Sequence, residues 1–130
     1  MKFGYTIVFV SSVTEALAFY KEAFGFETRF LDDSGQYGEL DTGTTVLAFA
    51  SHAMGEMNFG EHYQKAAPNA ASFGVALAFV VENVASAYAR ATAAGATSIN
   101  EPVKKPWGQI VAYVRAKEGE LIELCSPMGG

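Results

Sequence analysis

Hydrophobic and polar positions follow two kinds of pattern along the chain, one typical of strands and one typical of helices. Residues 5–10 (YTIVFV) are β-branched or aromatic almost throughout, as in a buried strand. Ser12 with Glu15 forms a capping box, apolar residues then recur at helical spacing from Val13, and Gly25 suits the end of the helix. The pattern therefore predicts a strand followed by an amphipathic helix.

Further strands are expected after this helix, at 26–31, 36–41 and 44–50, separated by the turn sequences Asp-Asp-Ser-Gly and Thr-Gly. The stretch 51–72 changes character, because it has no clean period and contains both histidines. We interpret it as a linker, with at most a short helical turn around 61–65. The first half of the chain thus has the order β-α-β-β-β.

The pattern restarts in the second half. A strand is predicted over 74–81, Asn83 is a plausible helix cap, and Gly95 closes a helix whose apolar positions begin at Val84. A turn-rich loop is expected at 101–106, and the remaining strands at 97–100, 107–115 and 120–125.

An internal repeat relates the two halves. Residues 10–13 match residues 81–84, and the same offset places Ala76 at the position of Tyr5. Each half alone is too small to bury a good core. We therefore expect one α+β domain of two tandem β-α-β-β-β modules, with curved mixed sheets around a cavity. The expected bounds are 1–130 for the domain, about 1–50 for module one, about 51–72 for the linker and about 73–127 for module two.

Composition and charge narrow the classes of function. Half of the residues are hydrophobic, which suits a packed core, and the net charge of −5 argues against nucleic acid and anionic membranes as partners. Neither a signal peptide nor an apolar run long enough for a membrane span is evident, so a cytoplasmic protein is expected. The single cysteine, Cys125, excludes an intramolecular disulfide and is interpreted as a buried thiol.

Several short motifs resemble the vicinal oxygen chelate superfamily, which includes glyoxalase I, extradiol dioxygenases, fosfomycin-resistance enzymes and bleomycin-resistance-type binding proteins. They lie at 18–21 (AFYK), 24–26 (FGF), 107–109 (WGQ) and 120–124 (ELIEL), and the resemblance covers residues 5–127. It implies the repeated fold described above. It also implies a homodimer with ligand crevices near the subunit interface.

Metal-dependent members of that superfamily take ligands, typically His or Glu, from four strand positions. The resemblance places these on Tyr5, on Ala76, on or next to Leu47, and on Glu123. Only Glu123 keeps a ligating group, and a transition metal needs three or four ligands. We therefore expect no metal and no cofactor.

The two histidines, His52 and His62, lack the spacing of a metal pair and are interpreted as surface residues. A site formed by Glu123, His52 and Glu39 stays open as an alternative, and it would require the linker to fold into the cavity.

Strand alternation indicates which side chains share the concave face. The candidate ligand-binding residues are aromatic and apolar residues around one carboxylate: Tyr5, Ile7, Phe9, Leu47, Ala76, Trp107, Tyr113 and Glu123. Such a set suits a flat, partly cationic or hydrogen-bonding ligand. The alternative is that these aromatic residues simply fill the core.

The leading functional hypothesis is a metal-free small-molecule-binding protein, similar to the members that sequester antibiotics, with an aromatic or cationic ligand. The second is a lyase, isomerase or dioxygenase of the same superfamily. Such an enzyme is metal-dependent with displaced ligands, or it uses Glu123 as a general base. A third is a domain with a vestigial pocket.

Overall fold

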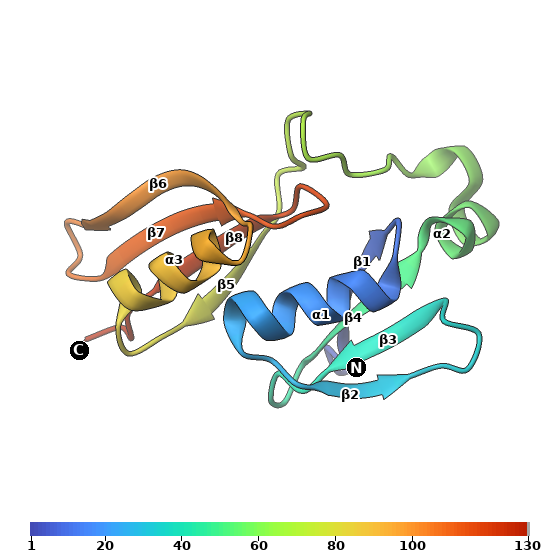
Figure 1. Cartoon of the computed structure of the whole chain (residues 1–130), viewed down its shortest axis with the longest axis horizontal. Coiled ribbons are helices and arrows are strands. Elements are labelled where there is room, and N and C mark those ends of the chain that lie inside the picture. The colour runs from blue at the N-terminus through green and yellow to red at the C-terminus, as the bar shows by residue number, and fades with distance from the viewer. Residues whose placement is uncertain (130) are drawn as a thin grey trace. The chain divides into compact units, whose positions relative to one another are not determined.

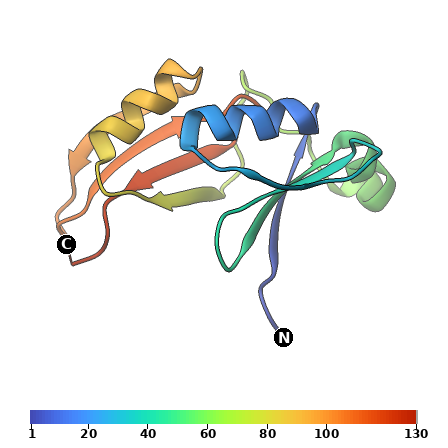
Figure 2. The ribbon, with the colours of Figure 1, turned by 60° about the horizontal axis from the view of Figure 1, so that its bottom comes forward.

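Each half of the chain forms its own compact unit in the computed structural model (Figure 1). The units are Met1–Ala66 and Ala67–Gly130, and the structure describes residues 1–129. Each unit has a four-stranded mixed sheet. A helix that follows the first strand covers one face of that sheet (Figure 2).

The first unit follows the predicted order and adds a helix at its end. Its sheet has the strand order β1-β4-β3-β2, with β1 parallel to β4 and the other pairs antiparallel. The elements are β1 (Tyr5–Val10), α1 (Val13–Phe24), β2 (Thr28–Leu31), β3 (Tyr37–Leu40), β4 (Val46–Ser51), α2 (His52–Phe59) and the 3-10 turn η1 (Gly60–His62).

Local sequence fixes both ends of α1. The Ser12 hydroxyl accepts a hydrogen bond from the Glu15 amide at 3.2 Å, as the capping box predicts. Gly25 follows the helix with a φ of 80°, a left-handed conformation that glycine adopts without steric cost. The buried face of α1 packs on the sheet, with the rings of Tyr20 and Phe49 at a centroid distance of 4.8 Å.

The second unit repeats this arrangement. Its sheet has the strand order β5-β8-β7-β6, and β5 runs parallel to β8. The Asn83 side chain accepts a hydrogen bond from the Ser86 amide at 3.0 Å and so caps the helix. The elements are β5 (Ala76–Val80), α3 (Val84–Ala93), β6 (Thr97–Lys104), β7 (Ile110–Arg115) and β8 (Leu121–Cys125).

These features confirm the predicted fold class, an α+β chain with two β-α-β-β-β modules. Tyr5 is the first residue of β1 and Ala76 the first residue of β5. Each of these strands runs parallel to the strand of its sheet that comes last in the sequence, β1 to β4 and β5 to β8. The internal repeat in the sequence therefore corresponds to a repeat in the structure.

Three expectations about individual elements were wrong. Residues 52–59 form the helix α2 instead of an irregular linker, and Ser51 caps it by accepting a hydrogen bond from the Met54 amide at 3.2 Å. Strand β6 continues to Lys104 through two irregularities in its register, where a loop was expected from 101. Strand β7 begins at Ile110, so Trp107 lies outside it.

Within residues 1–129, none of the helices has the length and apolar character needed to span a membrane.

Candidate functional site

Strand register separates the two faces of the first sheet. Val8 pairs with Phe49, and the Phe49 ring packs on α1. Because side chains alternate along a strand, the neighbouring positions of β1 point away from α1. These positions are Tyr5, Ile7 and Phe9, so the structure brings three of the candidate residues together on the face opposite α1.

Leu47 does not share this face. It pairs with Thr6 and lies on the α1 side, where it is buried. The register also identifies the position that corresponds to Glu123, because Ile7 pairs with Ala48 in the first sheet as Ala78 pairs with Glu123 in the second. The residue next to Leu47, Ala48, therefore occupies the equivalent site position.

Helix α2 and Tyr63, the residue after η1, pack against one end of the open face. Phe9 contacts the rings of Phe59 and Tyr63, each at a centroid distance of 5.5 Å. The Tyr63 hydroxyl lies 2.7 Å from Nδ1 of His52, and burial raises the pKa of this tyrosine. One expected surface histidine thus takes part in an aromatic cluster. At the other end of β1, Tyr5 stays 57% exposed.

A polar cluster also lies on this face. Tyr37 donates a hydrogen bond to Glu39 at 2.7 Å, and Nε of Arg29 lies 3.5 Å from the same carboxylate. Burial and the neighbouring Glu39 raise the pKa of Tyr37. Sequence reasoning missed Tyr37 and Arg29. The one available signal was the spacing of Tyr37 and Glu39, which puts both side chains on one face of a strand.

In the second sheet, α3 covers the face that carries Ser98, Val114 and Ile122. These three residues pair across the sheet, and Tyr88 of α3 donates a hydrogen bond to the Ser98 hydroxyl at 2.6 Å. The alternate positions therefore form the face without α3. They include Ala76, Ala78, Val80, Tyr113, Glu123 and Cys125.

Glu123 is the carboxylate at the centre of this second face. Tyr113 pairs with it directly and donates a hydrogen bond to it at 2.9 Å. That hydrogen bond, together with burial, raises the pKa of Tyr113. Burial and the negative charge of Glu123 also raise the pKa of the Cys125 thiol. The structure thus brings Ala76, Tyr113 and Glu123 to one face of one sheet.

Trp107 was expected to share a strand face with Tyr113, and this was wrong. It lies in the turn between β6 and β7, which the Gly108 amide closes by donating to the Lys105 carbonyl at 2.9 Å. Gly108 has a φ of 103° that favours a turn over a strand. Trp107 is 61% exposed, and its indole N–H donates to the Gln109 side chain at 2.8 Å.

The positions that the resemblance assigns to metal ligands hold one usual ligand side chain, that of Glu123. No group of three or more His, Cys, Asp or Glu side chains that could hold a metal ion is found among residues 1–129. The positions assigned to ligands by resemblance carry Tyr5, Ala76, Ala48 beside Leu47, and Glu123. The alternative set divides between the two units, with His52 and Glu39 in the first and Glu123 in the second.

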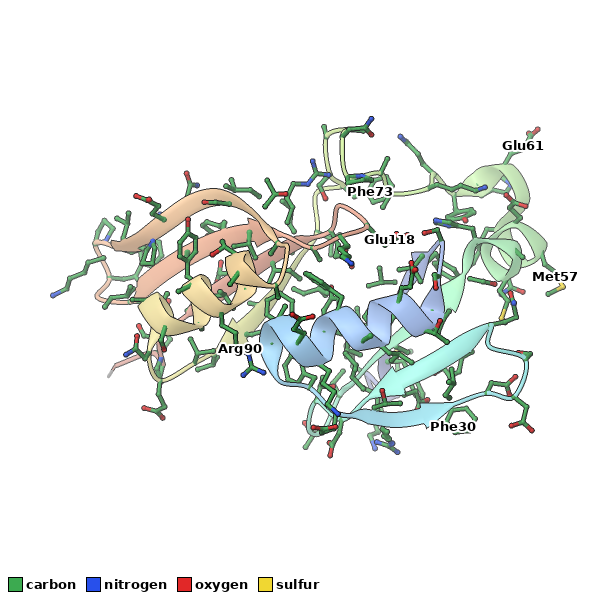
Figure 3. The ribbon with its side chains drawn as sticks, viewed as in Figure 1. Phe30, Met57, Glu61, Phe73, Arg90 and Glu118 are labelled. Carbon is green, nitrogen blue, oxygen red and sulfur yellow. The ribbon has the colours of Figure 1, made fainter. Side chains whose placement is uncertain are left out.

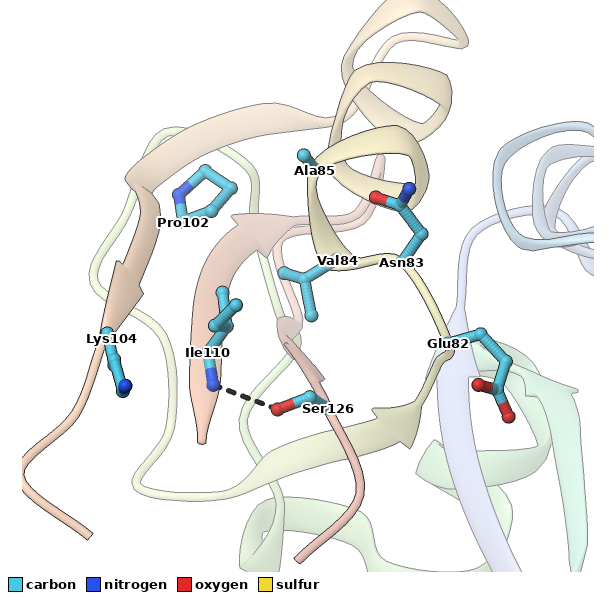
Figure 4. A pocket seen from close by; sticks show the side chains of 8 residues that line it. All are labelled: Glu82, Asn83, Val84, Ala85, Pro102, Lys104, Ile110 and Ser126. Atoms are coloured by element: carbon cyan, nitrogen blue, oxygen red, sulfur yellow. Dashed lines mark hydrogen bonds between the residues drawn. The ribbon is translucent and has the colours of Figure 1, made fainter. Parts of the chain in front are cut away.

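A cleft of about 490 Å³ opens at the start of α3 in the second unit (Figure 4). Its polar Ser126 is already engaged, because its hydroxyl accepts a hydrogen bond from the Ile110 amide at 2.9 Å. Glu82 and Lys104 lie on opposite sides of it (Figure 4). The cleft offers no converging set of reactive groups, and the sequence contained no signal for it. Its lining residues are Glu82, Asn83, Val84, Ala85, Pro102, Lys104, Ile110 and Ser126.

Solved structures with the same fold include a glyoxalase-related enzyme from Fulvimarina pelagi, with 21% identity, a TM-score of 0.81 and coverage of 98% of this chain and 88% of that one. A glyoxalase/bleomycin resistance protein/dioxygenase family enzyme from Burkholderia phytofirmans PsJN has 23% identity, a TM-score of 0.82 and coverage of 97% and 98%. TioX from Micromonospora sp. ML1 has 21% identity, a TM-score of 0.72 and coverage of 97% and 98%. At these identities the likeness concerns the fold.

No curated protein sequence matches this chain significantly. The family model of the Glyoxalase/Bleomycin resistance protein/Dioxygenase superfamily matches residues 2–124. The match covers nearly the whole chain and agrees with the repeated fold and with the short motifs that suggested the resemblance. The chain therefore belongs to the glyoxalase/bleomycin resistance protein/dioxygenase superfamily.

Proposed function

We propose that this chain is a metal-free small-molecule-binding protein that holds an aromatic or cationic ligand on Glu123. The observation that carries the proposal is the partly buried Glu123 carboxylate on an otherwise largely apolar sheet face, with Tyr113 as its hydrogen-bond donor. The alanines at 76 and 78 leave room beside it. A carboxylate has about four acceptor sites, so the bond to Tyr113 leaves capacity for a ligand N–H group.

Apolar surroundings favour this use of the carboxylate. A charged group on an apolar face loses much of its hydration, and it gains most from a partner that brings a complementary charge and a flat apolar body. The residues at the ligand positions of metal-dependent relatives also support binding without a metal, because Glu123 is the only usual ligand among them.

Calorimetric titration with metal-free bleomycin and with mitomycin C tests this proposal. We expect binding of at least one of these antibiotics, and a loss of about ten- to a hundredfold in affinity in Glu123→Gln, which removes one charge-assisted bond. Glu61→Gln is the matched control, because Glu61 is an exposed residue of the other unit. An affinity unchanged by Glu123→Gln would remove this residue from the site.

An enzyme of the same superfamily is the second candidate. The observation in its favour is again the contact of Tyr113 with Glu123, because a carboxylate and a phenol 2.9 Å apart can pass a proton to and from a bound substrate. Elemental analysis of the purified protein separates part of this candidate from the first. A stoichiometric bound metal would favour a metal-dependent lyase, isomerase or dioxygenase.

A further inference from the structure

A β-bulge in β2 turns two consecutive side chains toward Glu39. Thr28 pairs with Leu40 and Phe30 pairs with Glu39, so two steps along β2 match one step along β3. Arg29 is the extra residue. Bulges re-aim side chains and are frequent beside functional sites. Here the bulge brings the Arg29 guanidinium to Glu39, while Phe30 takes the paired position on this edge strand (Figure 3).

Glu39 forms an ion pair with Arg29 but leaves the Arg29 side chain exposed to solvent. The Arg29 side chain is 54% exposed, whereas the Glu39 side chain is only 13% exposed. One carboxylate oxygen of Glu39 faces Nε of Arg29 at 3.5 Å, and the other accepts the hydroxyl of Tyr37 at 2.7 Å. Within residues 1–129, no other ion pair or hydrogen bond of Arg29 is found. The terminal N–H groups of the guanidinium thus stay accessible, in the fork geometry that suits a carboxylate.

Apolar groups lie next to this exposed cation. Phe30 is 47% exposed, and its ring lies 6.4 Å from that of Tyr37. Ile7, which is 44% exposed, lies in the same row of the sheet as Glu39, with Ala48 between them. A flat apolar body resting on these side chains would place an attached anionic group beside Arg29.

We propose that this cluster, made of Arg29, Phe30, Tyr37 and Glu39, is a binding site for the carboxylate of a small aromatic acid. Arg29 binds the anion, Phe30 contacts the ring, and Glu39 is a positioning residue that fixes the guanidinium. The net charge of −5 disfavours nonspecific binding of anions elsewhere on the chain. The Tyr37 phenol is protonated at neutral pH, because its pKa is raised from an ordinary value that is already about 10, and it therefore donates to Glu39.

Three probes with the same ring test the charge dependence: benzoate is anionic, benzamide neutral and benzamidine cationic. Backbone amide chemical shifts, followed by ¹H–¹⁵N NMR at low salt, report both the affinity and the location. We expect benzoate to change the amide chemical shifts of residues 28–40. It should also bind about tenfold more tightly than benzamide, because it gains one charge-assisted contact that is still partly exposed to solvent. Arg29→Gln should abolish this preference, and Arg29→Lys should retain part of it because the charge stays and the fork is lost.

Arg90→Gln is the matched control, because Arg90 lies on α3 of the other unit and loses the same charge. It should leave the preference for benzoate unchanged. Equal affinities for benzoate and benzamide, or a preference that survives Arg29→Gln, would overturn the proposal. If the melting temperature of Arg29→Gln is far below that of the wild type, Arg29→Lys becomes the test. Its ratio of benzoate to benzamide affinity should then be lower than in the wild type but still above one, and a ratio equal to that of the wild type would overturn the proposal.

The cluster lies wholly within the first unit, so this inference does not rest on the proposed role of Glu123. The two proposals fail separately. Benzoate binding that is lost in Arg29→Gln and kept in Glu123→Gln supports the carboxylate site, whatever the antibiotic titrations show. Antibiotic binding that depends on Glu123, without any preference for benzoate, supports the proposed function alone.

Discussion

Tyr113 and Glu123 are directly paired across β7 and β8, and the phenol donates a hydrogen bond to the carboxylate at 2.9 Å. An unpartnered carboxylate on an apolar face would cost several kcal/mol, on the order expected for a desolvated charge. Arg115 lies on the same strand as Tyr113 and carries a positive charge that could pair with Glu123. Its guanidinium instead donates to the carbonyls of Gly119 and Ala67, at 2.8 and 3.0 Å. Removing the charge of Glu123 should therefore leave these backbone contacts intact.

The first prediction concerns Cys125, whose thiol is buried near Glu123. Burial and the negative charge of Glu123 raise its pKa, so little reactive thiolate exists at pH 8. We expect iodoacetamide to modify Cys125 much more slowly in the folded protein than in urea. Glu123→Gln should speed the reaction of the folded protein, because it removes the charge that disfavours the thiolate.

Mass spectrometry of the alkylated protein over time gives this rate. Glu61→Gln serves again as the control and should react like the wild type. A folded protein that is alkylated as fast as the unfolded chain would contradict the prediction.

The second prediction is a loss of stability in alkali. The pKa values of Tyr37, Tyr63 and Tyr113 are raised in the folded protein, each chiefly by burial or by a hydrogen bond. A tyrosine whose pKa is higher in the folded protein than in the unfolded chain stabilises the fold, and this stabilisation is complete at pH values below the unfolded-chain pKa of about 10. The stabilisation is lost as the pH rises from the pKa of the unfolded chain toward the pKa of the folded protein.

Urea unfolding at pH 8 and at pH 10.5 checks this expectation. The urea concentration at the midpoint should be lower at pH 10.5 than at pH 8. The decrease should be smaller in Tyr37→Phe, which cannot ionise at that position. A midpoint that is constant from pH 8 to 10.5 in the wild type would contradict it.

The helices α1 and α3 could be predicted from sequence because their signals are local. Caps at Ser12 and Asn83 and apolar residues at helical spacing are contained within one segment. The helix α2 could not be predicted, because its residues show little amphipathic pattern and include Gly55. A side chain at Gly55 would meet the Tyr63 ring, with Cβ only 2.7 Å from Cζ. This tertiary contact explains the glycine, and sequence alone does not reveal it.

The candidate site was predictable where strand alternation decides the face, as for Tyr5, Ile7 and Phe9. It was not predictable where register decides. Leu47 and Ala48 differ by one position, and a shift of one residue moves a side chain to the other face. The bulge at Arg29 is likewise a property of strand pairing, since it exists only relative to β3.

The third prediction is that the protein forms a homodimer. Strand β2 is an edge strand of the first sheet and β6 an edge strand of the second, and most of their residues are exposed. Exposed edge strands present unpaired N–H and C=O groups that favour pairing with another chain. Light scattering at micromolar concentration should give the mass of two chains. The mass of one chain would contradict this proposal.

The last prediction uses Gly119, which turns the chain between β7 and β8. Its φ is 101°, a conformation that side chains rarely adopt, and a Cβ there would lie 2.5 Å from the Ala67 carbonyl oxygen. Because the obstacle is backbone and also accepts a hydrogen bond from Arg115, it cannot rotate away as a side chain could. Gly119→Ala should therefore lower the free energy of unfolding by about 2–4 kcal/mol, from strain and steric overlap together. Gly74→Ala is the matched control, because a Cβ at Gly74 meets nothing within 4 Å. It should change the free energy of unfolding by less than about 1 kcal/mol. Urea unfolding of both variants measures the two effects, and equal midpoints would show that the turn can relax around the new side chain.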